Sequence, residues 1–234
     1  INSGDDMIID FHFKLDDNTF MSDRYRENIK NATPEGVFYD RDILGLWVTG
    51  EGVVYRDFSE KMFVDNVPED ITKFYAGVDW GYEHYGSIVV IGESADGSIY
   101  LLEEHAHQHE EIDFWVDVAK DIKRRYGNIT FWADSARPEH VARFQREQIK
   151  TFNANKAVLS GIEEVAKFMK AGRFFVVSDK VSRFKDEVYQ YIWNEKTGEP
   201  IKENDDVLDA LRYAIYSQHS QPKATVKRKS LYGL

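Results

Sequence analysis

The sequence predicts an α/β fold, in which a mixed sheet is flanked by helices and preceded by an N-terminal linker segment. Three apolar strand patterns follow one another over residues 73–104, and Ala-Asp-Gly at 95–97 forms a tight turn between the last two. Closely spaced strands joined in this way are typical of antiparallel pairs. From residue 110 onward, helical and strand patterns alternate, which favours further strands with helices packed on the sheet.

The first 70 residues predict less regular structure. Asp-Asn within residues 16–18 indicates a turn, and Ser22 is placed to cap a short helix over residues 24–30. A short strand is expected at 53–55. Residues 66–70 include Pro68 and have the composition of a linker, so we expect a boundary after residue 70.

Beyond residue 70 the periodicity is clearer. The predicted strands lie at residues 73–79, 87–92, 98–104, 129–134 and 174–177. The predicted helices lie at residues 110–126, from Pro138 onward, and at 162–170, 181–193 and 205–217. Pro138 suits a helix start because its missing N–H has no partner there. The last helix carries an apolar stripe at helical spacing, formed by Val207, Leu208, Leu211, Ala214 and Ile215.

Composition sets outer limits on the function. The 234 residues are 42% hydrophobic and 14% aromatic, which is enough for a substantial core. No run of about 18 apolar residues is present, so we expect no membrane span. The absence of cysteine excludes disulfides and thiolate metal ligands within this sequence.

The net charge of −11, taken alone, argues against nucleic-acid binding. Its distribution is uneven, however. Residues 103–117 carry acids and no Lys or Arg, whereas the tail from 222 to 234 carries four cations and no acid. Because acidic clusters are also metal sites, the overall charge does not decide the question.

Three aspartates stand where chemistry is expected. Asp79 and Asp134 end apolar strands, and Asp209 lies in the last helix. A carboxylate at the end of a buried strand is costly without a partner, and two carboxylates about 4 Å apart repel by roughly 1–4 kcal/mol. A divalent cation bound between the carboxylates replaces this repulsion with attraction, and Mg²⁺ prefers carboxylate oxygens as ligands. A pair of ions can clamp the attacking and leaving oxygens of a phosphodiester.

The acids at the start of the last helix leave a choice. Asp205 and Asp206 each share a helix face with Asp209. Asp209 is the better ligand candidate, because Leu208 and Leu211 fix that turn against the core. Asp205 and Asp206 also suit the helix dipole without any ligand. For Asp79, Asp134 and Asp209 the competing interpretation is helix capping or turn formation.

These stretches resemble the nuclease domain of the large terminase subunit of tailed phages. Residues 78–81 read Val-Asp-Trp-Gly, residues 133–136 read Ala-Asp-Ser-Ala, and residues 209–213 read Asp-Ala-Leu-Arg-Tyr. The resemblance implies a ribonuclease-H-like fold, in which Asp79, Asp134 and Asp209 bind two Mg²⁺ or Mn²⁺ ions. It implies an endonuclease that cuts concatemeric double-stranded phage DNA during genome packaging, in the host cytoplasm, with the portal protein and small terminase subunit as partners.

The resemblance extends upstream. Residues 44–47, Leu-Gly-Leu-Trp, and 52–55, Gly-Val-Val-Tyr, look like the segment that joins the family's ATPase to its nuclease. Residues 8–13 look like the last ATPase strand. The implied organisation is the end of an ATPase domain and a linker over 1–70, a nuclease domain over 71–220 and a basic tail over 221–234. A phosphate-binding Gly-Lys-Ser/Thr loop is absent, so we expect no unaided ATP hydrolysis.

Other residues are weaker candidates. Some family members carry His three residues before the last Asp, and here Asp206 holds that place as a fourth candidate ligand. Arg137, Arg143 and Lys156 are candidates for DNA phosphate contacts, although a solvated helix face explains the arginines equally well. Either Glu103 or Glu104 is a candidate to face the metal site, or both form a polar strand end. The alternating His105, His107 and His109 fit either a transition-metal site or a solvated strand edge.

Three alternative functions are carried forward. The first is a resolvase-like or transposase-like nuclease of the same fold, against which the segment at 44–47 argues. The second is an actin-like or sugar-kinase-type ATPase, whose first strand also ends in Asp-x-Gly, as at 79–81. Such proteins need a second Gly-rich loop, and this sequence has no Gly-Gly pair. The third is a packaging module without catalytic activity.

Overall fold

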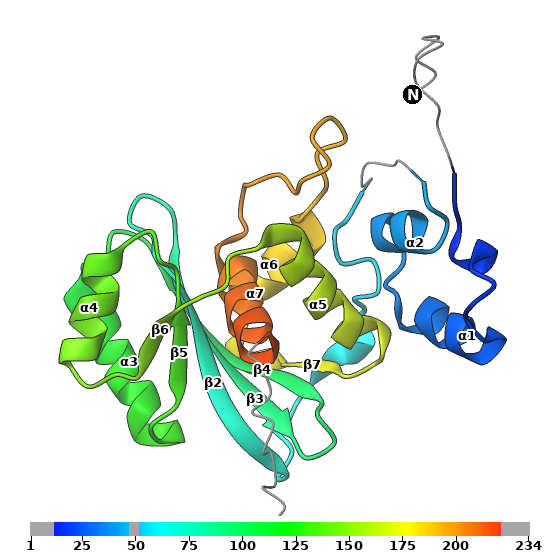
Figure 1. Ribbon diagram of the computed structural model, residues 1–234. Helices are drawn as coiled ribbons and strands as arrows, with labels where there is room; N and C mark the ends of the chain where they lie inside the picture. Colours follow the sequence, from blue (N-terminus) through cyan, green and yellow to red (C-terminus); the bar gives the residue numbers. More distant parts are fainter. Residues whose placement is uncertain (1–11, 47–51, 221–234) are drawn as a thin grey trace, which may run out of the picture.

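The computed structural model describes residues 12–46 and 52–220, and its centre is one mixed seven-stranded sheet (Figure 1). The strand order is β1-β7-β4-β3-β2-β5-β6. The strands are β1 (Phe63–Val64), β2 (Ile71–Asp79), β3 (Gly86–Ser94), β4 (Ile99–His107), β5 (Thr130–Ala133), β6 (Thr151–Asn153) and β7 (Phe174–Val177). The predicted α/β class is confirmed.

The sheet is mixed because its three central strands form an antiparallel meander, whereas the strands on either side follow crossover connections and pair in parallel. β2, β3 and β4 pair antiparallel, whereas β5 joins β2 in parallel and β7 joins β4 in parallel. The predicted turn between β3 and β4 is present, with Gly97 at φ +79°. There the Asp96 carboxylate accepts bonds from Ser94 and from the backbone and side chain of Ser98, which lower its pKa to about 2.

Helices cover both faces of this sheet (Figure 1). One face packs against α3 (Ile112–Tyr126) and α4 (Pro138–Arg146), and the other against α5 (Val158–Lys170), α6 (Ser182–Gln190) and α7 (Asp206–His219). Alternation along β2 explains the division, since Ala76 and Val78 join the first core while Tyr75 joins the second. No helix in the described part of the chain is both long and apolar enough to cross a membrane.

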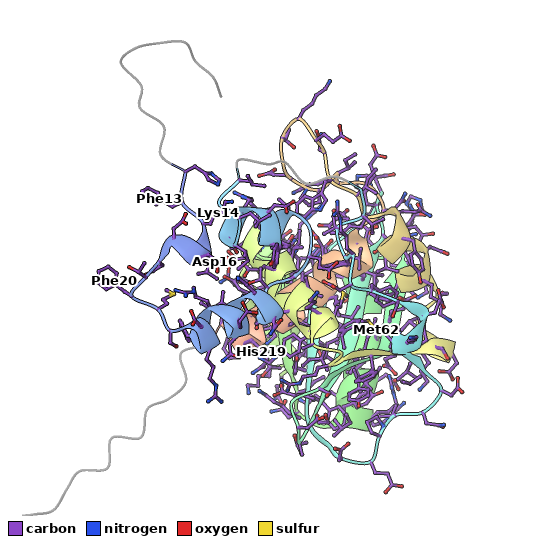
Figure 2. All side chains as sticks on the ribbon, turned by 90° about the vertical axis from the view of Figure 1, so that its right-hand side faces the viewer. Phe13, Lys14, Asp16, Phe20, Met62 and His219 are labelled. Atoms are coloured by element: carbon purple, nitrogen blue, oxygen red, sulfur yellow. The ribbon has the colours of Figure 1, made fainter. Side chains whose placement is uncertain are left out.

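The N-terminal segment forms two short helices beside this core, α1 (Asp23–Ala32) and α2 (Val37–Asp42). Ser22 caps α1 as predicted, because its hydroxyl accepts the Tyr25 N–H at 3.3 Å. α1 buries none of its residues, and Phe13 and Phe20 project outward nearby, 70% and 99% exposed (Figure 2). In contrast, six apolar residues from α2 to the start of β1 join the core on the face that carries α5, α6 and α7, namely Val37, Phe38, Val54, Tyr55, Phe58 and Met62.

Some predicted elements differ from the structure. The strand expected at 53–55 is wrong, since Val53 makes only an isolated bridge to Ile192. The short elements α2, β1 and β6 were not predicted, because two to six residues carry too little periodicity. The strand expected at 8–13, the tryptophan at 47 and the basic tail lie wholly or mostly outside the described residues. The domain boundary after residue 70 stays a prediction.

The contact between β2 and α7 is exceptionally close. A Cβ atom added to Gly77 would lie 1.9 Å from the carbonyl oxygen of Ala210 and 2.9 Å from the Cβ of Ala214. Only glycine therefore permits this approach of helix to strand. Asp79 follows two residues later, so it is directed to the same face of the sheet as Gly77 and towards α7.

Candidate functional site

Asp79 and Asp134 lie at the ends of neighbouring parallel strands. Val78 of β2 pairs with Ala133 of β5, and the Asp134 N–H donates to the Val78 carbonyl at 2.9 Å. Parallel strands place their carboxyl ends at the same edge of a sheet, so the two aspartates emerge side by side. The Trp80 indole N–H donates to the Asp134 carbonyl at 2.9 Å and holds the two strand ends together.

The first turn of α7 completes the acidic group. Ser87 is paired across the sheet with Asp79, and its hydroxyl donates to the Asp206 carbonyl oxygen at 2.7 Å. That bond places the start of α7, and with it Asp206 and Asp209, beside the end of β2. We call Asp79, Asp134, Asp206 and Asp209 the aspartate cluster.

Electrostatics confirm that these acids lie within each other's influence. Burial raises the pKa of Asp79 well above its ordinary value, and the charges of Asp209, Asp134, Asp206 and Asp205 raise it further, in that order. Burial also raises the pKa of Asp205 to about 6, with Asp209 and Asp206 next in effect. Residues far apart in the sequence have therefore been brought together by the fold.

Three members of the aspartate cluster are paired with protein cations. The Lys156 ammonium lies 2.5 Å from Asp134 Oδ1, Arg183 lies 3.0 Å from Asp206 Oδ2, and Arg212 lies 2.7 Å from Asp209 Oδ1. Among residues 12–46 and 52–220, no three His, Asp or Glu side chains converge closely enough to hold a metal ion as they stand. The carboxylates are turned towards these cations rather than towards one common point.

The residues of the cluster nevertheless fit a divalent metal. All four offer carboxylate oxygens, the ligands that hard cations such as Mg²⁺ and Mn²⁺ prefer. Within the described part of the chain, the Asp79 carboxylate has no hydrogen-bond donor and no cation in contact, although four other acids raise its pKa. A carboxylate that is partly buried among like charges needs a compensating positive charge.

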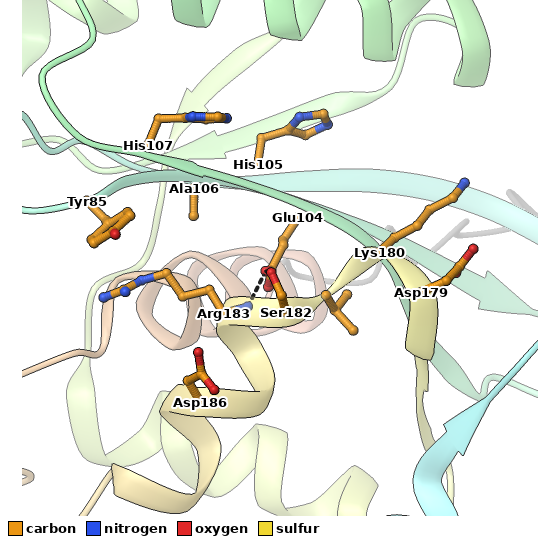
Figure 3. Close-up of a pocket in the computed structure, with 11 residues that line it drawn as sticks. Tyr85, Glu104, His105, Ala106, His107, Asp179, Lys180, Ser182, Arg183 and Asp186 are labelled. Atoms are coloured by element: carbon orange, nitrogen blue, oxygen red, sulfur yellow. Dashed lines mark hydrogen bonds between the residues drawn. The ribbon is translucent and has the colours of Figure 1, made fainter.

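Two glutamates cap the helices that frame the cluster. The Glu104 carboxylate accepts the backbone N–H groups of Arg183 and Phe184 at 2.5 and 2.9 Å, at the start of α6 (Figure 3). Glu187 of α6 in turn accepts the N–H groups of Val207 and Leu208 at 2.9 and 3.0 Å, at the start of α7. Both side chains satisfy free N–H groups in the first turn of a helix, so β4 positions α6, and α6 positions α7, while burial raises the pKa of Glu187 to about 8.

Arg183 links this cap to the aspartate cluster. Its guanidinium lies 2.8 Å from Glu187, 3.0 Å from Asp206 and 3.6 Å from the centre of the Tyr85 ring. Arg183 and Tyr85 also line a polar hollow of about 500 Å³ between β4 and α6 (Figure 3). Sequence reasoning assigned no role to Arg183 or Glu187, because their spacing on α6 is that of any solvated helix face.

Glu103 and Glu104 lie within β4, which continues to His107, and neither joins the aspartate cluster. Glu104 caps α6, and Glu103 points to the other side of the sheet, where Arg125 donates to it twice at 2.6 Å and the Tyr126 hydroxyl at 3.1 Å. Glu103 therefore does not face the aspartate cluster, and it is not a polar strand end either, because it is buried in the interior of β4 and bonded to Arg125.

Replacing Glu103 with glutamine is expected to lower the free energy of unfolding at pH 7 by about 2–3 kcal/mol. Burial alone would raise the pKa of Glu103, but the bonds from His105 and Arg125 outweigh it and lower the pKa to about 2. Because the folded-state pKa is depressed, this stabilisation is present above about pH 4.5 and is lost as the pH falls towards 2. Urea unfolding between pH 2.5 and 7 measures it, and the variant should lose that part of the pH dependence.

Asp121→Asn is the matched control for Glu103→Gln. Asp121 pairs with the same Arg125, at 2.7 Å, but its side chain is 39% exposed. Solvent screening makes such an exposed pair weak, so the loss of stability should be much smaller than for Glu103→Gln. Equal losses in the two variants would contradict the expected role of Glu103.

The three histidines do not form one site. His105 lies 3.2 Å from Glu103, His107 packs edge-on against Phe114, and His109 packs against Tyr82. β4 ends at His107, and His109 has a positive φ of 60°, so the strand alternation does not continue. No metal-binding group of His, Asp and Glu exists at these positions among the described residues.

The candidate DNA-binding residues lie in different surroundings. Lys156 contacts Asp134 and is therefore at the aspartate cluster. Arg137 immediately precedes α4, is 56% exposed and lies 3.9 Å from Glu139. Arg143 pairs instead with Glu147, the residue after α4, and with Asp113 on α3, at 2.9 Å for the latter. Lys156 contacts the aspartate cluster itself and Arg137 has one acid at 3.9 Å, whereas Arg143 pairs with two acids, so the geometry favours Lys156 and Arg137 as phosphate contacts.

Comparison with known proteins gives one family and several similar folds. The family model described as the terminase RNaseH-like domain matches residues 76–218, a range that contains the whole aspartate cluster. No protein with a curated description matches the chain.

Among solved structures, the large terminase of the thermophilic bacteriophage D6E is 28% identical, with a TM-score of 0.78 over 87% of this chain and 54% of that one. This chain therefore spans about half the length of that protein. The large terminase nuclease domain of bacteriophage SPP1, solved with bound Mn, is 17% identical, with a TM-score of 0.56 over 71% of this chain and 99% of that one. The large terminase nuclease of the thermophilic phage G20c, solved with bound magnesium, is 14% identical, with a TM-score of 0.53 over 70% and 97%. The last two likenesses are of fold alone.

Proposed function

The chain belongs to the family of terminase RNase H-like domains, and from that premise we propose that it is a metal-dependent DNA endonuclease. Its substrate is concatemeric double-stranded phage DNA, which it cuts during genome packaging as part of the terminase motor. The observation that carries the proposal is the position of Asp79, which is partly buried among four other acids and has no cation in contact among the residues that the structure describes.

The aspartate cluster would hold two divalent metal ions, which we take to be Mg²⁺ or Mn²⁺. Its ligands would be Asp79, Asp134, Asp206 and Asp209. When bound, divalent ions supply the positive charge that phosphodiester hydrolysis needs at the attacking and leaving oxygens. The SPP1 and G20c nuclease domains, whose structures contain Mn and magnesium, support this choice of metal.

The remaining residues bind and orient the substrate. Lys156 lies beside Asp134, and Arg137 is three residues after Asp134 in the sequence. Lys156 and Arg137 can therefore both reach a phosphodiester that lies over the aspartate cluster. Arg143 is a more distant contact, available only if it exchanges Asp113 for a phosphate. Backbone contacts of this kind read no base edges, so we expect cleavage of low sequence specificity.

The wider assignments follow the family. We propose that residues 1–70 continue an ATPase domain and its linker, and that the portal protein and the small terminase subunit are partners during assembly in the host cytoplasm. The likeness to the D6E large terminase, of which this chain spans about half the length, supports this organisation.

Incubation of the chain with supercoiled plasmid tests the proposal. With millimolar Mn²⁺ or Mg²⁺ we expect relaxed and then linear DNA, and EDTA should abolish the reaction. A four-way junction should be cut no faster than a plain duplex, because a preference for it would favour the resolvase alternative. Release of phosphate from ATP would favour the actin-like alternative, and folded protein that leaves the plasmid intact in both metals would favour the inactive module.

A further inference from the structure

One buried arginine connects Asp209 of the aspartate cluster with the backbone that carries Lys156. Arg212 is 2% exposed and lies three residues after Asp209 on α7. One terminal nitrogen donates to Asp209 Oδ1 at 2.7 Å, and the other donates to the carbonyl oxygens of Lys156 and Ala157 at 3.2 and 3.3 Å. A single guanidinium therefore bonds to a cluster carboxylate and to the backbone that carries Lys156.

The surroundings of Arg212 fix its position. A Cβ atom added to Gly161 of α5 would lie 2.7 Å from the Cγ and 2.9 Å from the Cδ of Arg212, so this glycine makes the space in which the side chain lies. The guanidinium also lies 4.7 Å from the centre of the Tyr213 ring, whose hydroxyl donates to Asp209 Oδ2 at 3.4 Å. Both oxygens of Asp209 are thereby oriented from α7 itself.

The segment at 154–157 depends on α7 at both ends. The Asn155 N–H donates to the Ser217 hydroxyl at 2.8 Å, and the carbonyls of Lys156 and Ala157 accept from Arg212. Lys156 reaches Asp134 from this segment. Displacement of Arg212 would therefore move Asp209 directly, and Lys156 through its backbone.

We propose that Arg212 is a positioning residue, which sets the place of the Asp209 carboxylate and of Lys156 relative to one another. This role rests on the proposed function, because it takes Asp209 to be a metal ligand. The alternative is that Arg212 only neutralises the charge of Asp209. Lysine distinguishes the two roles, since it keeps the charge but cannot reproduce the planar fork that reaches three acceptors at once.

The test is the affinity of the full chain for Mn²⁺, measured by calorimetry and by electron paramagnetic resonance of the free ion. Arg212→Lys is expected to weaken binding about 10- to 100-fold, the usual effect of losing a residue that orients a ligand. Gly161→Ala should weaken binding in the same direction while leaving Asp209 and Arg212 chemically unchanged. Cleavage by both variants should recover at high Mn²⁺ concentration, because the defect is in the position of a ligand.

Arg124→Lys is the matched control. Arg124 also pairs with an aspartate three residues away, Asp121, but its side chain is 78% exposed and donates to no backbone carbonyl of the described residues. The Mn²⁺ affinity of the Arg124→Lys variant should equal that of the wild type. Circular dichroism and thermal melting establish that each variant is folded, and if Arg212→Lys is not, Gly161→Ala decides alone.

Two negative results have different meanings. If Asp209→Asn abolishes Mn²⁺ binding but Arg212→Lys and Gly161→Ala bind as the wild type does, Arg212 is a counter-ion only and the positioning role is wrong. If the wild type binds no Mn²⁺, or Asp209→Asn binds it equally well, the proposed function fails first. The Asp209→Asn measurement separates the two cases.

Discussion

Asp79→Asn is expected to abolish metal-dependent DNA cleavage and, in the same protein without metal, to raise the free energy of unfolding. Loss of one charge that stabilises a transition state commonly reduces turnover by about 10²–10³-fold, and we expect at least this loss in the plasmid assay. The asparagine keeps the size of the side chain and removes the charge that the other four acids oppose.

The sign of the stability effect follows from the direction of the pKa shift. Burial and the neighbouring acids raise the folded-state pKa of Asp79 above its unfolded value. Its contribution to stability is therefore present below the unfolded pKa and is lost as the pH rises through the folded one. At pH 7.5, in EDTA, the wild type should unfold at a lower urea concentration than the variant.

Asp117→Asn provides the control, because Asp117 is exposed on α3. It should change neither cleavage nor stability appreciably. Cleavage by Asp79→Asn at a rate near that of the wild type would remove Asp79 from the reaction. A variant less stable than the wild type in EDTA would show that the Asp79 carboxylate is compensated in the fold, contrary to its surroundings.

Gly77→Ala is expected to destabilise the protein by about 3 kcal/mol or more, at the upper end of the cost of overpacking. Its methyl group would lie 1.9 Å from the Ala210 carbonyl oxygen, so either α7 or β2 must move. α7 also carries Asp206 and Asp209, so cleavage should fall together with stability. Urea unfolding gives the loss as a shift of the midpoint at constant slope.

Gly92→Ala is the matched change on β3. A Cβ atom there would meet only side-chain methyl groups of Ile71 and Leu102, at 3.1 Å, which can adjust. Its cost should stay below about 1 kcal/mol. Equal midpoints for Gly77→Ala and Gly92→Ala would mean that α7 can shift away from β2 at little cost. The close contact between β2 and α7 would then not set the position of Asp206 and Asp209.

Periodicity predicted most of the fold beyond residue 70. The strand at 174–177 agrees residue for residue with β7, and the longer strands and helices differ from the predictions only at their ends. β6 was missed because Thr-Phe-Asn is too short and polar to show a strand pattern. Val53 to Tyr55 has strand-forming residues, but within the described residues Val53 makes only the isolated bridge to Ile192, so tertiary context overrides propensity.

The acids of the site were predictable, but the residues that position them were not. Asp79, Asp134 and Asp209 end or begin regular elements, which gives a local signal. Neither α6 nor α7 has a capping bond from the side chain before it, and the caps come instead from Glu104 and Glu187 across the tertiary structure. A single sequence carries no sign of such long-range pairs.

Arg143 shows a related limit. Counted along the sequence, residues 137–150 form a basic run suited to DNA, and Arg143 is central to it. In the fold it pairs with Glu147 and with Asp113 of α3. Linear charge patterns cannot show which cations are already compensated by acids from another element, so its role in DNA binding stays a prediction.

Because β2 is hydrogen-bonded to a strand on each side, we expect the part of the site on the sheet to move less than the parts on loops and helices. β2 pairs with β3 along nearly its whole length and with β5 over its second half, up to Val78. The backbone that bears Asp79 is thus held on both sides, and we expect its amides to exchange slowly with solvent. Lys156 lies in a loop and Arg183 on a separate helix, so, for the DNA substrate proposed above, we expect adjustment to a duplex in those elements rather than in the sheet.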